Sequence, residues 1–160
     1  MKKLLFLSYV FVIFSCQKTE IKQEMPVQKL HWEELEVNTR FQKVIINRHD
    51  SCEYQNLVYS DGIYSSPPKN YKLEKTEVRK FYLSKNEKDS LAKYIFESIS
   101  NPKFTDILVS DYVGNVELTF AKSNMKLKCE YRSVGDWTEV SPNTNKIYSL
   151  LNSKVKLSKW

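Results

Sequence analysis

The alternation of apolar and polar residues between 116 and 132 constrains the fold more than any other stretch of the chain. The apolar positions before Ser123-Asn124 are Val116, Leu118 and Phe120, and those after it are Met125, Leu127, Cys129 and Tyr131. Successive side chains of a strand point to opposite faces of a sheet, so this period of two predicts strands with one buried face. The sequence therefore predicts an antiparallel hairpin here, with its other face in water.

Three further strands are expected upstream of this hairpin. Val44-Ile45-Ile46 is a β-branched run, residues 54–59 lead into Asp61-Gly62, and residues 78–83 have a composition suited to a short strand. An Asp-Gly pair favours a two-residue hairpin because both turn positions take positive φ. We therefore expect residues 54–59 to pair antiparallel with the segment that starts at Ile63-Tyr64.

Two helices are predicted by their capping patterns. Ser84 and Glu87 fit the capping box, in which each side chain binds the amide of the other residue, and Asn101-Pro102 ends that helix. Ser141 is suited to cap a second helix, with Pro142 at its first position. The expected buried stripes are Leu91, Ile95 and Ile99 in the first helix, and Ile147, Leu150 and Leu151 in the second. Each helix therefore has an apolar face that must pack against a sheet.

Together these elements predict an α+β fold. We expect a single globular domain over residues 41–160, with an antiparallel β-sheet built from hairpins and two α-helices packed on one face. The 145 residues that follow residue 15 are enough for one domain with a core and leave little room for two. The sequence leaves open whether Leu30–Val37 forms a short helix or an irregular approach to the domain.

The first fifteen residues have the pattern of a secretory signal peptide. Lys2 and Lys3 form a basic start, and the eleven residues from Leu4 to Phe14 include only Ser8 as a clearly polar residue. A membrane-spanning helix needs about 20 apolar residues, roughly twice this length. We therefore expect residues 1–15 to be a signal peptide and not a permanent span.

The end of this segment, Ile13-Phe14-Ser15-Cys16, resembles the lipobox of bacterial lipoproteins, although Phe14 stands where that family usually has a smaller residue. The resemblance implies cleavage before Cys16, a diacylglyceryl group on its sulfur and often a third acyl chain on the new amino terminus. Two or three acyl chains are enough for stable membrane anchoring. The alternative is an ordinary signal peptide with a chance cysteine.

Residues 16–40 are predicted to be the lipidated cysteine and a flexible tether, because Gln17–Lys29 is polar and contains Pro26. The expected location is the cell envelope, most simply the outer membrane, and the face of the membrane stays open. Removing Lys2 and Lys3 lowers the formal net charge from +6 to +4. The lysines are interspersed with acids, so we expect a solvated surface and no nucleic-acid partner.

His49-Asp50-Ser51-Cys52 contains a nucleophile, a base and an acid, which invites a catalytic interpretation. In an extended segment, however, His49 and Cys52 point to opposite faces and cannot share a proton. Acids such as Asp106 and Asp111 lack the spacing of a metal site, and there is no glycine-rich phosphate loop. We therefore expect no catalytic residue, no metal and no cofactor.

Cys52 and Cys129 are the two thiols that remain once Cys16 carries lipid. The envelope outside the inner membrane is oxidising, so these two residues are a candidate disulfide. The alternation at 125–131 places Cys129 on the buried face of its strand, where a small apolar side chain is an equally good account.

Three aromatic residues are candidates for binding. Tyr64 and Tyr71 flank Pro67-Pro68, a loop predicted because proline lacks an amide donor, and Trp137 follows Gly135-Asp136 in what reads as an exposed loop. Exposed rings stack on sugars or anchor protein partners. The alternative is that these rings belong to the core and its rim.

The sequence is best explained by a lipid-anchored envelope lipoprotein that is not an enzyme and binds a protein or glycan. The first alternative is a small envelope hydrolase, which would need Cys52 or a serine in a cleft beside His49 or His31. The second alternative is a purely structural or assembly lipoprotein. Convergence of these side chains would favour the hydrolase, and an exposed aromatic patch would separate a binding role from a structural one.

Overall fold

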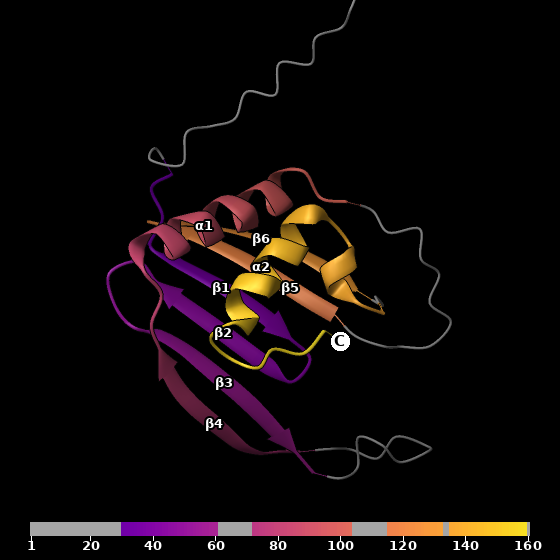
Figure 1. The fold of residues 1–160 in the computed structure, drawn as a ribbon. Coiled ribbons are helices and arrows are strands. Elements are labelled where there is room, and N and C mark those ends of the chain that lie inside the picture. Colours follow the sequence, from indigo (N-terminus) through magenta and orange to yellow (C-terminus); the bar gives the residue numbers. More distant parts are fainter. Residues whose placement is uncertain (1–29, 61–71, 104–114, 133–134, 160) are drawn as a thin grey trace, which may run out of the picture.

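The computed structural model describes residues 30–60, 72–103, 115–132 and 135–159. They form one α+β domain in which two helices cover one face of a six-stranded antiparallel sheet, as predicted (Figure 1). The strands are β1 (Glu34–Thr39), β2 (Gln42–Asn47), β3 (Cys52–Tyr59), β4 (Leu73–Phe81), β5 (Asn115–Lys122) and β6 (Met125–Arg132). The helices are α1 (Lys85–Ser100), the short 3-10 helix η3 (Trp137–Glu139) and α2 (Pro142–Asn152).

The order of strands across the sheet is β4-β3-β2-β1-β5-β6. The first four strands follow one another as a meander, and α1 then crosses the sheet from the edge strand β4 to β5. This crossover puts β1 in the interior of the sheet, antiparallel to both β2 and β5. The helices lie above the β1, β2, β5 and β6 side of the sheet and leave β4 uncovered (Figure 1).

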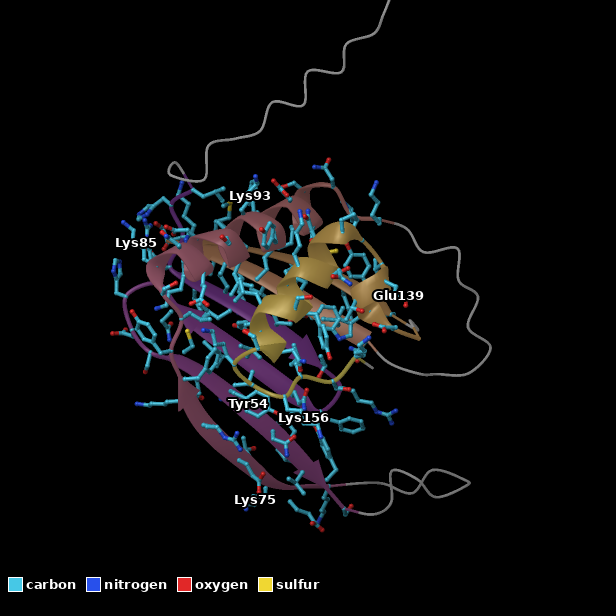
Figure 2. All side chains as sticks on the ribbon, viewed as in Figure 1. Tyr54, Lys75, Lys85, Lys93, Glu139 and Lys156 are labelled. Atoms are coloured by element: carbon cyan, nitrogen blue, oxygen red, sulfur yellow. The ribbon has the colours of Figure 1, made fainter. Side chains whose placement is uncertain are left out.

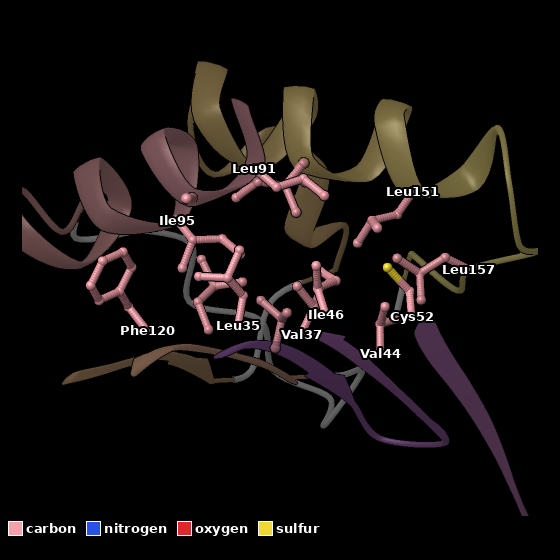
Figure 3. Packing of buried hydrophobic residues seen from close by; sticks show 14 of the residues in the cluster. Leu35, Val37, Val44, Ile46, Cys52, Leu91, Ile95, Phe120, Leu151 and Leu157 are labelled. Carbon is pink, nitrogen blue, oxygen red and sulfur yellow. The ribbon is translucent and has the colours of Figure 1, made fainter. Parts of the chain in front are cut away.

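The core lies between the sheet and the helices (Figure 3). Every second residue of the inner strands points into it, because strand side chains alternate between faces. Its fully buried large side chains are Trp32, Leu35, Val37, Ile46, Leu83, Leu91, Ile95, Leu118, Phe120, Trp137, Ile147 and Leu151. The predicted apolar faces of both helices are therefore confirmed, with Leu91, Ile95, Ile147 and Leu151 innermost.

The predicted domain start at residue 41 is wrong. Trp32 is 1% exposed, and β1, which the tether was expected to include, is an interior strand. Leu35 and Val37 face the core, whereas Glu36 and Asn38 lie on the opposite face. Leu35 and Val37 alternate with Glu34, Glu36 and Asn38, which is the period of two of a half-buried strand, but the pattern is short and has only two apolar positions. The second half of Leu30–Val37, from Glu34 onward, is therefore part of a strand, and not the helix or irregular approach that the sequence left open.

The hairpin predicted from the alternation at 116–132 is confirmed as β5 and β6. Its two-residue turn is Ser123-Asn124, and Ser123 takes a positive φ of 49°, as such turns require. Cys129 lies half-buried on the core side of β6, as its place in the alternation indicated.

The partner predicted for residues 54–59 is wrong. β3 pairs along its whole length with β4, and Tyr59 lies opposite Leu73. Residues 61–71, including the expected turn at Asp61-Gly62 and the proline loop, lie outside the described residues. The Asp61-Gly62 pattern led to the wrong partner, because β3 ends at Tyr59 and the strand that pairs with it begins only at Leu73.

Both predicted helix caps are confirmed. The Ser84 hydroxyl accepts a hydrogen bond from the Glu87 amide at 3.3 Å, and the Glu87 carboxylate accepts one from the Ser84 amide at 2.7 Å. These bonds, together with a contact to Lys154 at 2.9 Å, lower the pKa of Glu87 to about 2. Ser141 caps α2 in the same way through Thr144.

Ser84→Ala is expected to lower the free energy of unfolding by about 1 kcal/mol, because it leaves an amide of the first helical turn without its acceptor. Urea unfolding followed by circular dichroism measures the difference. Ser149→Ala, on the exposed side of α2, is the matched control and should change stability by less than about 0.5 kcal/mol. Equal stability of wild type and Ser84→Ala would contradict the importance of the cap.

Candidate binding groove between the sheet and the C-terminal segment

A groove of about 990 Å³ lies where β3 and β4 extend beyond the helices. Its floor is formed by β3 and β4, and its opposite wall by residues 156–159, with Tyr148 of α2 above them. The lining residues are Gln42, Tyr54, Asn56, Lys75, Thr76, Glu77, Val78, Arg79, Tyr148, Lys156, Leu157, Ser158 and Lys159. This volume is at the upper end of the range for small-molecule pockets, and the groove is open enough for part of a larger partner.

The C-terminal wall is held by side chains of the sheet and of η3. Gln42 donates from Nε2 to the Lys156 carbonyl at 3.2 Å and accepts from the Ser158 amide at 2.6 Å. The Tyr54 hydroxyl donates to the same Lys156 carbonyl at 3.1 Å, and this bond joins β3 to the wall (Figure 2). Because Val155 and Leu157 are buried, the segment turns its Lys156 side chain outward.

The groove has an excess of positive charge. Lys75, Arg79, Lys156 and Lys159 line it against the single carboxylate of Glu77. Glu77 accepts a hydrogen bond from Lys75 at 2.8 Å, and this contact, helped by Asn56, lowers the pKa of Glu77.

Two of the four cations form no ion pair within the described part of the chain. Lys159 is paired with Asp136 at 3.1 Å, which raises the pKa of Lys159. Among the described residues, no ion pair is formed by Arg79 or by Lys156. Arg79 acts on the Glu77 carboxylate at longer range and helps to lower its pKa. The groove still has four cations against one carboxylate, and this excess favours an acidic ligand.

Trp137 is not the exposed binding residue that the sequence predicted. Its side chain is completely buried, its indole nitrogen donates to the Ser158 carbonyl at 2.8 Å, and its ring meets Tyr148 edge-on at 5.7 Å between centroids. The residues before it resembled a surface loop, but η3 turns the ring inward. Trp137 therefore supports the wall of the groove from behind, and does not contact a ligand in it.

The other predicted sites divide into two groups. Cys16, Tyr64 and Tyr71 lie outside the described residues. Cys52 and Cys129 are free thiols, so the candidate disulfide is wrong. Three strands separate β3 from β6, which puts the two cysteines about 19 Å apart at the usual strand spacing, whereas a disulfide needs Cα atoms within roughly 7 Å.

His49 and Cys52 do not form a catalytic pair. Cys52 is completely buried and its sulfur points into the core (Figure 3), and burial raises the pKa of its thiol. His49 is exposed in the turn before β3.

The turn before β3 is held by the buried ammonium of Lys88. It donates to three backbone carbonyls, those of Asn47 at 2.6 Å, Arg48 at 3.3 Å and Asp50 at 2.6 Å. Lys88 thus fastens α1 to the β2–β3 connection, which gives this polar stretch a structural role.

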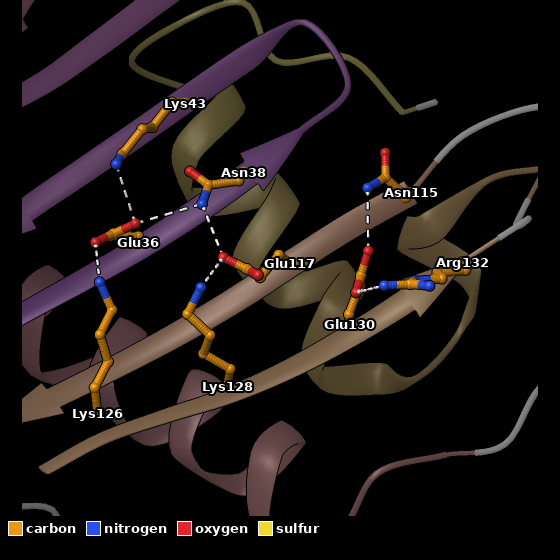
Figure 4. Close-up of polar contacts among 9 residues, drawn as sticks. All are labelled: Glu36, Asn38, Lys43, Asn115, Glu117, Lys126, Lys128, Glu130 and Arg132. Atoms are coloured by element: carbon orange, nitrogen blue, oxygen red, sulfur yellow. Dashed lines mark hydrogen bonds and ion pairs between the residues drawn. The ribbon is translucent and has the colours of Figure 1, made fainter.

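The open face of the sheet carries a polar network that sequence reasoning did not find (Figure 4). Glu36 is only 6% exposed and contacts Lys126 at 2.8 Å and Lys43 at 3.2 Å. Asn38 donates to both Glu36 and Glu117, and Glu117 also pairs with Lys128 at 2.8 Å. Side chains from β1, β2, β5 and β6 are linked in this way, so the network fixes strand register across the middle of the sheet. The signal for it was the run of charged residues at alternate strand positions.

In the part of the chain that the structure describes, no helix is long and apolar enough to cross a membrane. The same residues contain no group of three or more histidine, cysteine, aspartate or glutamate side chains that could hold a metal ion. No protein-family model matches the chain, and no match was found to a curated protein or to a solved structure.

Proposed function

We propose that this chain is a lipid-anchored binding module of the bacterial cell envelope, and that its groove binds an acidic partner. The observation that carries the proposal is the presence of Arg79 and Lys156, two cations without an ion-pair partner among the described residues, in one groove. Binding a carboxylate there would give each of them an ion-pair partner without breaking an ion pair already present. The lipobox resemblance at Cys16 supports the anchor.

A binding role without catalysis is favoured by the surroundings of the reactive side chains. The only cysteine near a histidine in sequence, Cys52, is buried, and His49 lies exposed outside the core. The charged residues of the groove are cations and one paired carboxylate, which suit attraction of an anion more than proton transfer.

A charge reversal at Lys156 tests the groove. The full-length chain, kept in detergent, is titrated with fluorescent poly-L-glutamate at low and at physiological salt. Lys156→Glu should weaken binding about tenfold, since it replaces attraction by repulsion, and binding of the wild type should weaken as salt screens the charges.

Lys122→Glu is the matched control, because Lys122 is an exposed lysine at the end of β5, and it should bind as the wild type does. Equal loss in both variants, or no binding by the wild type at low salt, would contradict the assignment of the groove as the binding site.

The anchor is tested separately by metabolic labelling with a fatty-acid analogue. The label should appear on the wild type and be absent from Cys16→Ala, and equal labelling of both would overturn lipidation.

A further inference from the structure

β4 is an exposed edge of the sheet. It is nine residues long, its first eight residues are all exposed, and no described strand pairs with its outer side. An edge strand of this length presents unpaired amides and carbonyls to any other strand.

The backbone groups at the free edge can be assigned. The Leu57 amide donates to the Phe41 carbonyl at 2.7 Å, which places the backbone groups of Leu57 on the β2 side. Backbone groups of successive residues alternate between sides, so those of Asn56 face β4 and bond with the opposite residue, Glu77. Along β4, every second residue therefore points its backbone groups away from β3. These residues are Thr76, Val78 and Lys80.

The charges on β4 suit a second copy of the same strand in one register. We infer that two copies of this chain pair antiparallel through β4, with Val78 of one copy opposite Val78 of the other. In this register Glu77 lies opposite Arg79 of the second copy, and the same pair recurs on the other side of the twofold axis. Both residues project from the groove face of β4. These positions form a non-hydrogen-bonded pair, in which Cα atoms are about 4.5 Å apart and side chains are closest.

The neighbouring registers are less favourable. Moving the axis by one residue puts Glu77 opposite Glu77 and Lys75 opposite Arg79, and like charges directly opposite each other are destabilising. Moving it to Thr76 pairs Lys75 with Glu77 of the second copy, but these residues already form such a pair within each chain. That register also leaves Arg79 without a carboxylate of the second copy opposite it. Of the three registers compared, only the one centred on Val78 puts a carboxylate of the second copy directly opposite Arg79.

The open face of β4 supports the same register. Val78 is 57% exposed, and it is an apolar residue between two polar ones, Thr76 and Lys80, on that face of β4. Two Val78 side chains in contact across the axis would cover this apolar surface, whereas a monomer leaves it in water. The six-stranded sheet would continue into that of the second copy, and the two grooves would lie on the same face beside the axis. In the dimer Arg79 is paired with Glu77 of the second copy, so Lys156 is the groove cation that still has no ion-pair partner among the described residues and stays available to an acidic ligand.

Cysteine cross-linking tests the register in the full-length chain in detergent. Val78→Cys puts two thiols on the axis, with Cα atoms about 5.5 Å apart, within the range of a disulfide. Mild oxidation should therefore give a covalent dimer on a non-reducing gel. Thr76→Cys is the matched control, because its two copies would be about 14 Å apart. Equal cross-linking of both variants, or of neither, would overturn the register.

Charge exchange tests the pairing itself. Sedimentation velocity in density-matched detergent should show a wild-type dimer, and Glu77→Arg or Arg79→Glu should each weaken dimerisation about tenfold or more, because each turns two attractive pairs into repulsive ones. The double variant Glu77→Arg/Arg79→Glu should restore the dimer. A monomeric wild type, or a double variant as weak as the single ones, would overturn the inference. Binding of poly-L-glutamate by a monomeric wild type would leave the proposed function standing, so the two failures are distinguishable.

Discussion

Trp137→Ala is expected to lower the free energy of unfolding by about 4 kcal/mol, the range observed when a large aromatic side chain is removed from a core. Trp137 is completely buried, contacts the Tyr148 ring and holds the Ser158 carbonyl through its indole nitrogen. Removing it leaves a cavity and a carbonyl without its donor. Urea unfolding of the full-length chain in detergent, followed by circular dichroism, measures the effect.

Two further variants separate the causes. Trp137→Phe keeps most of the ring and loses the hydrogen bond, so it should cost about 1–3 kcal/mol. Tyr82→Ala removes a ring that is 76% exposed and should change stability by less than about 0.5 kcal/mol. A loss of under 1 kcal/mol for Trp137→Ala would show that η3 does not fix the C-terminal wall of the groove.

Glu36→Gln is expected to lower the free energy of unfolding by about 2 kcal/mol at pH 7. Burial alone would raise the pKa of Glu36, but hydrogen bonds from Lys126 and Lys43 outweigh it and lower the pKa from 4.5 to about 2. A shift of that size corresponds to at most roughly 3 kcal/mol. The smaller figure allows for solvent around the two lysines, whose side chains are 34% and 48% exposed.

The pH dependence of this effect has a definite sign. The carboxylate binds protons more weakly in the folded chain than in the unfolded chain, so its contribution is present above pH 4.5 and is lost as the pH falls through 2. The difference in unfolding free energy between wild type and Glu36→Gln should therefore shrink between pH 5 and pH 2. Unfolding in urea at a series of pH values measures it. A difference that stays constant over that range would contradict the ionised network.

The parts of the fold that the sequence predicted correctly are those specified by neighbouring residues. The β5–β6 hairpin follows from alternation and a two-residue turn, and both helices begin at capping residues that act over three positions. The fold class follows, because two amphipathic helices and several half-buried strands leave few ways to cover both apolar surfaces.

The errors occur where distant residues decide the structure. β1 lies between β2 and β5, and Glu36 is paired with Lys43 of β2 and Lys126 of β6, so the place of β1 in the sheet depends on segments far along the chain. Asp61-Gly62 predicted a tight hairpin, yet the partner of β3 is β4. Cys52 and Cys129 seemed available to each other until the strand order separated them.

The groove could not have been predicted for the same reason. Arg79 and Lys156, which form no ion pair among the described residues, are brought together only because residues 156–159 return across the sheet to Gln42 and Tyr54. Alternation could have indicated that Lys75, Glu77 and Arg79 share one face of β4. It could not have indicated which segment lies opposite that face.

The interior position of β1 also determines how the domain would respond to mechanical force. Any pull on the residues before Leu30 reaches the domain through β1, which is hydrogen-bonded to β2 on one side and to β5 on the other. Withdrawing such a strand along its own axis loads both ladders in shear, so that their bonds resist together. An edge strand such as β4 would instead peel away one bond at a time. If Cys16 carries lipid, as proposed, the chain is attached through the strand best placed to carry tension.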